Sequence, residues 1–261
     1  MIKIENIQVG GFEAAFRGLR NPMNSWDKSD SRFGISSSPY NDDDYDATAT
    51  YINSNFIEHS QEWEKEFETI NNWLLENGVL KKDTETDAIE YAYIGKNDMN
   101  LARRMILAGT DEAKFMRMIH VQMDVTAPLY WWKEADTYKV GTVANSCSTM
   151  HKIHAKEFTL EDFSCEHLTE ESLESLKLIV KDLNKTREAY NWCNTDAKKD
   201  WWWQMIQLLP SSYNQKRTLD FNYQTARAMY FARRNHKLDE WHTFTDTLLT
   251  LPYGNELIGV I

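Results

Sequence analysis

The alternation of apolar and polar residues predicts two strands in the first half of the chain. One covers residues 1–11, a strand-like segment in which Lys3 and Glu5 interrupt the apolar run that a signal peptide would need. The other covers residues 116–126 and is ended by Pro128. Its apolar residues occupy every second position, as in a strand with one buried face: Ile119, Val121, Met123 and Val125.

Apolar residues at steps of three and four predict helices over most of the remaining chain. Residues 61–77 and 99–108 have this spacing, and Gly109 would end the second of these helices. After Thr169, a suitable N-cap residue, the pattern is helical almost throughout. The helical stretches there are 169–190, 201–209 before Pro210, 221–234 and 238–249.

One long polar segment interrupts these patterns. Residues 24–50 are rich in Ser, Asp, Asn and Gly and have no apolar period, so we expect a mobile loop there. No internal repeat of roughly 20 to 50 residues occurs, and no Pro- or Gly-rich linker divides the sequence. We therefore expect one α+β domain over residues 1–261, with a helical C-terminal half.

Composition and charge narrow the class of protein. The 261 residues are 42% hydrophobic, which is enough to bury a sizeable core. The net charge of −11 disfavours non-specific binding to nucleic acid or to anionic membranes, so a site for an anionic ligand must gather its positive charge locally. No stretch approaches the roughly 18 to 20 apolar residues of a membrane helix, and three cysteines without CxxC spacing favour reduced thiols. We expect a cytoplasmic protein.

The most specific candidate for a binding site is the helix predicted after Pro210. Asn222, Ala226, Met229 and Arg233 are separated by four, three and four residues. A helix would therefore bring Asn222 and Arg233 onto one face, about 16 Å apart along the axis. An amide and a guanidinium so placed could contact two parts of one elongated ligand, although two solvated side chains fit the same spacing.

The order Leu209-Pro210, Asn222 and Arg233 resembles the carboxy-terminal signature of flavin-dependent thymidylate synthases. In that family, a Leu-Pro precedes a helix that carries Asn at its start and Arg three turns later. The resemblance implies that Asn222 lies near the flavin, and that Arg233 binds the pyrimidine of dUMP and activates it for methylation. Guanidinium suits this role because it stays charged and presents a planar fork of donors to a carbonyl that gains negative charge.

An upstream segment, residues 125–130, resembles the strand of the same family that ends in Ala-Pro and leads into its Arg-His-Arg motif, which is followed seven residues later by Ser. Carried forward without gaps, the motif falls on residues 137–139 and on Cys147. In the family, Arg-His-Arg holds FAD, and the serine and its neighbours contact dUMP. The resemblance thus implies cofactor contacts for Tyr138 and Lys139, and substrate contacts for Cys147 and Ser148.

The sequence departs from the family in this motif. Only Lys139 keeps a positive charge, and Cys147 stands where the family has a hydroxyl. A lysine neutralises phosphate as a point charge but does not reproduce the bidentate contact of an arginine.

The resemblance also implies a complete fold and activity. The fold is a central antiparallel sheet flanked by long helices, assembled as a homotetramer because the family builds its sites between subunits. An active protein would be a methyltransferase of nucleotide biosynthesis that alters C5 of dUMP, using FAD, NADPH and methylenetetrahydrofolate. The main alternative is a non-catalytic oligomeric interaction protein that kept the fold and lost the flavin chemistry.

A further alternative is a small zinc-binding protein. Five residues within 21 positions could contribute metal ligands: Cys147, His151, His154, Cys165 and His167. Their spacings match no structural zinc motif, so we assign no metal site. The tryptophans at 131–132 and 201–203 are assigned to packing or to a subunit contact.

Overall fold

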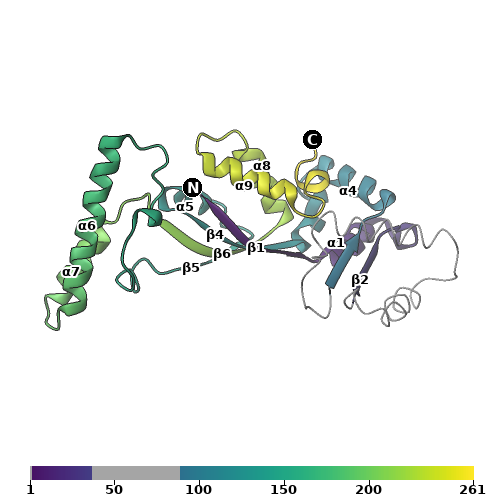
Figure 1. Ribbon diagram of the computed structural model, residues 1–261. Coiled ribbons are helices and arrows are strands. Elements are labelled where there is room, and N and C mark those ends of the chain that lie inside the picture. The colour runs from purple at the N-terminus through teal and green to yellow at the C-terminus, as the bar shows by residue number, and fades with distance from the viewer. Residues whose placement is uncertain (1, 37–88) are drawn as a thin grey trace, which may run out of the picture. The chain divides into compact units, whose positions relative to one another are not determined.

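The computed structural model describes residues 2–36 and 89–261 (Figure 1). The helix predicted over residues 61–77 lies outside these ranges, as does the part of the predicted loop that follows residue 36. No helix within the ranges is long and apolar enough to span a membrane.

Internal contacts divide the chain into two compact units, and each unit combines two separate stretches. The first contains Met1–Gln8 and Val121–Leu248, and the second contains Val9–His120 and Leu249–Ile261. Because neither unit is one continuous piece of sequence, no linker marks a boundary between them. The assignment of one domain stays a prediction.

The first unit is built on a four-stranded sheet with the strand order β1-β4-β6-β5. Its strands are β1 (Lys3–Gly10), β4 (His120–Pro128), β5 (Thr142–Ser146) and β6 (Asn214–Asn222). β5 and β6 are antiparallel, with Thr142 opposite Phe221 and Ser146 opposite Arg217. The predicted alternation in β4 is confirmed, because Val121, Met123 and Val125 are all buried.

Three helices of the first unit supply the core that covers one face of this sheet. They are α5 (Leu129–Ala135), α8 (Tyr223–Arg233) and α9 (Asp239–Thr250), and Figure 1 shows α8 and α9 together above the strands. Trp131 of α5 packs against Trp241 and Phe244 of α9, with ring centroids 4.7 and 5.4 Å apart. Trp131 and Trp132 are both buried, so their assignment to packing is confirmed.

The opposite face of the sheet is polar. Gln122 Nε2 donates to Asp220 at 2.9 Å, and Thr218 Oγ1 donates to Asp124 at 2.6 Å.

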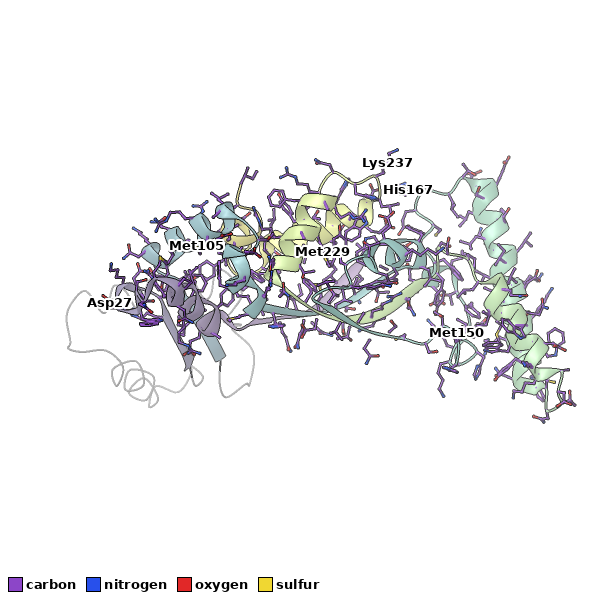
Figure 2. The ribbon with its side chains drawn as sticks, turned by 180° about the vertical axis from the view of Figure 1, so that it is seen from behind. Asp27, Met105, Met150, His167, Met229 and Lys237 are labelled. Carbon is purple, nitrogen blue, oxygen red and sulfur yellow. The ribbon has the colours of Figure 1, made fainter. Side chains whose placement is uncertain are left out.

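The long helices α6 (Glu170–Trp192) and α7 (Lys198–Leu208) form a hairpin in the first unit (Figure 1). The predicted cap is confirmed, because the Thr169 side chain accepts from the Ser172 amide. An apolar cluster joins the hairpin to the segment before it: Ile153, Phe158, Phe163, Leu176, Val180, Leu183 and Met205. Trp202 Nε1 donates to the carbonyl of Met150, which Figure 2 labels near the hairpin, whereas Trp201 and Trp203 are exposed.

The second unit contains α1 (Phe12–Arg20), α4 (Lys96–Ala108) and the antiparallel pair β2 (Arg32–Ser36) and β3 (Ile89–Tyr93). The remaining elements of the described residues are short helical turns: η1 (Asn21–Met23), η2 (Trp26–Lys28) and η3 (Glu112–Met118), then η4 (Leu160–Asp162) in the first unit, and η5 (Gly254–Ile258). The predicted end of α4 is confirmed, since Gly109 follows it with a φ of 147°.

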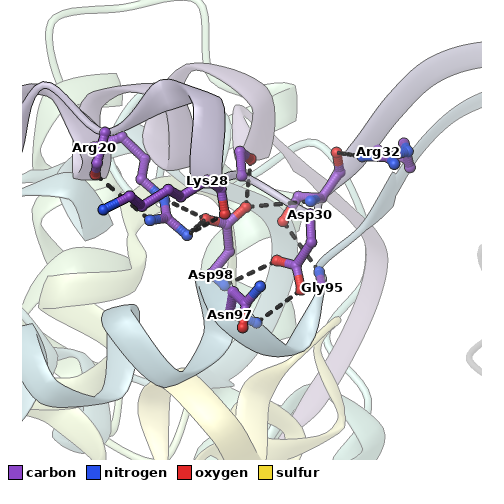
Figure 3. Close-up of polar contacts among 10 residues, drawn as sticks. Arg20, Lys28, Asp30, Arg32, Gly95, Asn97 and Asp98 are labelled. Atoms are coloured by element: carbon purple, nitrogen blue, oxygen red, sulfur yellow. Dashed lines mark hydrogen bonds and ion pairs between the residues drawn. The ribbon is translucent and has the colours of Figure 1, made fainter. Parts of the chain in front are cut away.

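A buried ion pair fixes the start of α4 in the second unit (Figure 3). Arg20 and Asp98 are 2.6 Å apart, and their side chains are 7% and 0% exposed. Burial acts to raise the pKa of Asp98, but hydrogen bonds from Ser29, Ser31 and Arg20 outweigh it and hold that pKa below its usual value. The pair therefore remains charged inside the unit.

The start of β2 corrects the expectation of a loop over residues 24–50. Residues 26–28 form a helical turn, and β2 occupies residues 32–36. The partner of β2 is β3, more than fifty positions later, and a local pattern of apolar residues does not reveal such a distant pairing.

Candidate functional site

Two segments that the family resemblance singled out in the sequence meet in the first unit. Arg233 lies in the last turn of α8, and Tyr138 lies in the loop between α5 and β5. Arg233 Nε donates to the Tyr138 hydroxyl at 2.9 Å, across 95 positions of sequence. The guanidinium also lies over the ring of Trp241, 5.0 Å from its centroid.

The charge of Arg233 is compensated by Glu134, a residue of α5 that sequence reasoning missed. Glu134 Oε2 accepts from Arg233 Nη1 at 2.8 Å and lies 3.0 Å from His236 Nε2. Trp241 Nε1 donates to the same oxygen at 3.3 Å. Since His236 Nδ1 accepts from the Leu238 amide, its Nε2 is the nitrogen that donates to Glu134. The Glu134 carboxylate thus binds part of the Arg233 guanidinium, which a ligand could otherwise bind.

The ion pair of Arg233 and Glu134 is only partly buried. The two side chains are 20% and 35% exposed. Arg233 Nη2 has no hydrogen-bond partner among the residues described, so the guanidinium keeps donor capacity for a ligand. Glu134 lies in α5, a helix that the sequence pattern did not predict, so no sequence signal identified it as the partner of Arg233.

Asn222 does not share a helical face with Arg233, which corrects the expectation from spacing. It is the last residue of β6, with extended backbone angles, and is the N-cap of α8. Its Oδ1 accepts from the Thr225 amide at 2.9 Å, and this satisfies a donor that the first turn leaves open. The error arose because β6, with few apolar residues, was not predicted.

A pocket of about 120 Å³ adjoins the arginine. It lies among α5, β5, β6, α8 and α9, and Met229, labelled in Figure 2, forms part of its wall. Tyr138, Lys139 and Trp241 also line it, so Arg233 reaches its edge by packing on two of its wall residues. Lys139 is exposed and has no ion-pair partner within the described ranges.

Cys147 and Ser148 lie at the other end of β5. The Cys147 amide donates to the Lys216 carbonyl at 2.9 Å, and Ser148 Oγ accepts from the amides of Met150 and His151. The strand β5 spans five residues, or about 17 Å, between these two residues and the loop that holds Tyr138. No contact described in this chain links either residue to Arg233.

Other basic side chains near the sheet are also paired. Arg217 Nη1 lies 2.7 Å from Asp136 and its guanidinium stacks over Trp132 at 4.2 Å. Lys216 lies 2.9 Å from Asp124. These arginine and lysine charges are engaged in ion pairs, in contrast to that of Lys139.

The residues considered as zinc ligands do not converge. His154 packs on the ring of Tyr190, and His167 pairs with Asp239 at 3.0 Å. Within residues 2–36 and 89–261, no group of three or more His, Cys, Asp or Glu side chains could hold a metal ion. The zinc alternative gains no support from this arrangement.

Comparison with known proteins supplies a fold. Neither protein-family models nor curated proteins match the sequence. Among solved structures, thymidylate synthase X of Helicobacter pylori with FAD and dUMP is similar, with a TM-score of 0.54 and 11% identity over 99% of this chain and 97% of that one. A second structure of that enzyme with FAD and dUMP has a TM-score of 0.52 and 12% identity, with 97% of each chain covered. At this identity the likeness shows a shared fold, which confirms the expected mixture of helices with an antiparallel sheet.

Proposed function

We propose that the first unit binds a pyrimidine nucleotide such as dUMP beside Arg233. In this proposal Arg233 contacts the pyrimidine, and Lys139 neutralises the phosphate. The observation that carries it is the hydrogen bond between Arg233 and Tyr138, which brings a residue expected to bind dUMP and a residue expected to bind the cofactor to the edge of one pocket. Solved structures of the same fold that contain dUMP add support.

The local chemistry suits an anionic ligand of modest charge. The chain carries a net charge of −11. The positive charges of the unpaired Lys139 and of the partly exposed Arg233 are therefore a local exception to the acidic character of the chain. A ligand carbonyl would take the open donors of Arg233, either beside Glu134 or in its place. Without a ligand, the Glu134 carboxylate is the counter-charge of the guanidinium, and a ligand would compete with it for Arg233.

The residues present do not fit FAD in the manner of an Arg-His-Arg motif. The diphosphate of FAD needs several strong donors, and residues 137–139 offer one lysine. Arg217 is paired with Asp136, and Arg233 is assigned to the pyrimidine in this proposal. We therefore derive no redox or methylation step, and we favour a nucleotide-binding protein that kept the fold without the flavin chemistry.

Calorimetric titration with dUMP tests this function. Arg233→Ala should weaken dUMP binding by at least roughly tenfold, since hydrogen bonds from a charged donor are lost. Arg234→Ala is the matched control, because its guanidinium packs over Tyr230 and Phe231 at the same helix end. Equal affinity of Arg233→Ala and the unmodified protein would refute the assignment.

Two further measurements address the finer expectations. Titration with FAD should show no saturable binding, and tight binding would restore the flavoprotein alternative. The homotetramer implied by the family resemblance is a separate proposal, which size-exclusion chromatography with light scattering tests.

A further inference from the structure

Basic side chains from three segments of the first unit lie around Tyr190, a residue in the last turn of α6. The ring of His154, from the segment before α6, has its centroid 4.5 Å from that of Tyr190. Lys198 is the first residue of α7, and its Nζ lies 4.6 Å from the centroid of the same ring. Arg187 precedes Tyr190 by three positions, which places both side chains on one face of α6.

The segment that carries His154 is anchored to the hairpin of α6 and α7. Ile153 is 4% exposed and belongs to the apolar cluster that joins this segment to the hairpin. Trp202 Nε1 donates to the Met150 carbonyl at 2.8 Å. The backbone on either side of Ile153 is therefore fixed next to the two helices. We call the basic residues brought together here the Tyr190 cluster: Lys152, His154, Arg187 and Lys198.

The Tyr190 cluster contains like charges without a counter-charge. Burial lowers the pKa of His154, and the positive charges of Lys152 and Lys198 lower it further. Among the residues described, no ion pair involves Lys152, Arg187 or Lys198. Three other lysines of the same region are each paired with a carboxylate: Lys156 with Asp162, Lys177 with Glu174 and Lys185 with Asp182.

Acidic side chains occur close to the cluster in the sequence but do not neutralise it. Glu188 follows Arg187, and Asp196 and Asp200 lie two positions before and after Lys198. In the part of the chain that the structure describes, none of the three acids forms an ion pair with the cluster. The cluster thus stays positive in a chain whose net charge is −11. Like charges held together repel one another, and a bound anion would remove that repulsion.

We propose that the Tyr190 cluster binds a small oxyanion of the phosphate class. A phosphate group accepts several hydrogen bonds at once, and lysine, arginine and imidazolium side chains are donors that suit it. The anion is either free phosphate or the phosphate group of a larger molecule, since both present the same oxygens. The inference goes beyond the proposed nucleotide function, because no member of the cluster lines the pocket beside Arg233.

The ring protons of His154 report binding in a proton NMR titration, because a bound anion favours the charged imidazolium. Inorganic phosphate should raise the pKa of His154 above its value in sodium chloride of the same ionic strength, which screens charges equally. The spectrum of His154→Gln identifies the signal. Equal pKa values of His154 in phosphate and in chloride would overturn the proposal.

Two neighbouring lysines at the start of α7 provide a matched pair of variants. Lys198 lies over the Tyr190 ring, whereas Lys199 is exposed and makes no such contact. Lys198→Gln should raise the pKa of His154 in chloride, because one repelling charge is lost, and should weaken phosphate binding by roughly three- to tenfold. Lys199→Gln should change neither quantity. Similar effects of the two substitutions would show that the cluster is only a set of solvated charges.

A second variant keeps the test decisive if Lys198→Gln loses helix content in its circular dichroism spectrum. Lys152 is exposed and lies outside both helices, so Lys152→Gln removes a charge of the cluster without changing the hairpin. It should also raise the pKa of His154 and weaken phosphate binding. Unchanged phosphate affinity in Lys152→Gln and Lys198→Gln would contradict the assignment.

Titration with dUMP distinguishes the two sources of phosphate and separates this inference from the proposed function. Tighter binding of dUMP than of inorganic phosphate, detected at His154, would identify a phosphate group of a larger molecule as the ligand, and weaker binding would identify free phosphate. Arg233→Ala should leave the response of His154 to inorganic phosphate unchanged. That response without any binding of dUMP would support this site and refute the nucleotide function, whereas dUMP binding at Arg233 without it would do the reverse.

Discussion

Two arginine–carboxylate pairs, one from each unit, have opposite surroundings. Arg20 and Asp98 in the second unit are almost completely buried, and Arg20 Nη2 also donates to the Lys28 carbonyl at 3.0 Å. Arg233 and Glu134 in the first unit are partly exposed and adjoin a pocket. Groups of the chain itself surround the first pair, whereas Arg233 in the second pair retains N–H donors that could bind a ligand.

We call the buried pair of Arg20 and Asp98 a structural clamp, because it only stabilises the fold. We call the pair of Arg233 and Glu134 an exchangeable contact, because its arginine could bind a ligand in place of the carboxylate. Removing one partner of a buried pair leaves an uncompensated charge in the interior, which typically costs about 3–5 kcal/mol. A pair in contact with water loses much less, because solvent screens the remaining charge. Only the second kind can release its arginine to a ligand without loss of the fold.

The largest predicted effect is that of Asp98→Asn. It should lower the free energy of unfolding by about 3–5 kcal/mol, because the Arg20 guanidinium loses its buried counter-charge. Urea denaturation followed by circular dichroism measures this loss. Glu13→Ala is the control from the same unit, since its pair with Arg17 is exposed and should change stability by less than about 1 kcal/mol. A loss of similar size for both substitutions would contradict the assignment of a clamp.

The sequence predicted the elements whose signal is local. The alternation in β4 and the N-cap at Thr169 are both read from a few neighbouring residues, and both are confirmed. β5 and β6 were missed because few of their residues are apolar: β5 is mostly exposed, and only Leu219 and Phe221 mark the buried side of β6. Strands with so few apolar residues are fixed by their partners rather than by their own residues.

The candidate site also contains features that the sequence predicted and features that it missed. The motif spacings singled out Arg233 and Tyr138, and the structure places the two side chains in contact. They did not predict Glu134 as the partner of Arg233, because an acidic residue on a short helix is usually a solvated side chain. They placed Asn222 at the start of the helix, and it is the N-cap of α8, but they did not predict that it also ends the strand β6.

A smaller effect is expected from pH on the buried pair. The pKa of Asp98 is lowered in the folded protein, so its contribution to stability is complete above the unfolded value of about 3.9 and is lost as pH falls through the folded value. The melting temperature should therefore fall more steeply below about pH 4 in the unmodified protein than in Asp98→Asn. Parallel curves for the two proteins would show that Asp98 does not titrate with unfolding.

The N-termini of α4 and α8 are capped in different ways, and loss of a cap typically costs about 1 kcal/mol of stability. The N-terminus of α4 is capped from a distance, because Asp30 accepts from the amides of Asn97 and Asp98, whereas α8 is capped by its own Asn222. Asn222→Ala should cost about 1 kcal/mol of stability, and Asn222→Asp should retain most of it. Thermal unfolding of both variants measures this difference. If Asn222→Asp is as unstable as Asn222→Ala, the cap is not what the side chain provides.

The smallest change in stability is expected for Glu134→Gln, and it gives the sharpest test of exchange. The neutral amide keeps the shape of the side chain but holds Arg233 less strongly, so the unfolding free energy should change by less than about 1 kcal/mol. The affinity for dUMP should rise several-fold, because the ligand no longer competes with a carboxylate for the guanidinium. Calorimetry with dUMP measures this gain, and Asp136→Asn, which releases Arg217 instead, is the matched control. A several-fold loss of affinity in Glu134→Gln would mean that the carboxylate positions Arg233 for the ligand, and the contrast between a closed and an exchangeable pair would then fail.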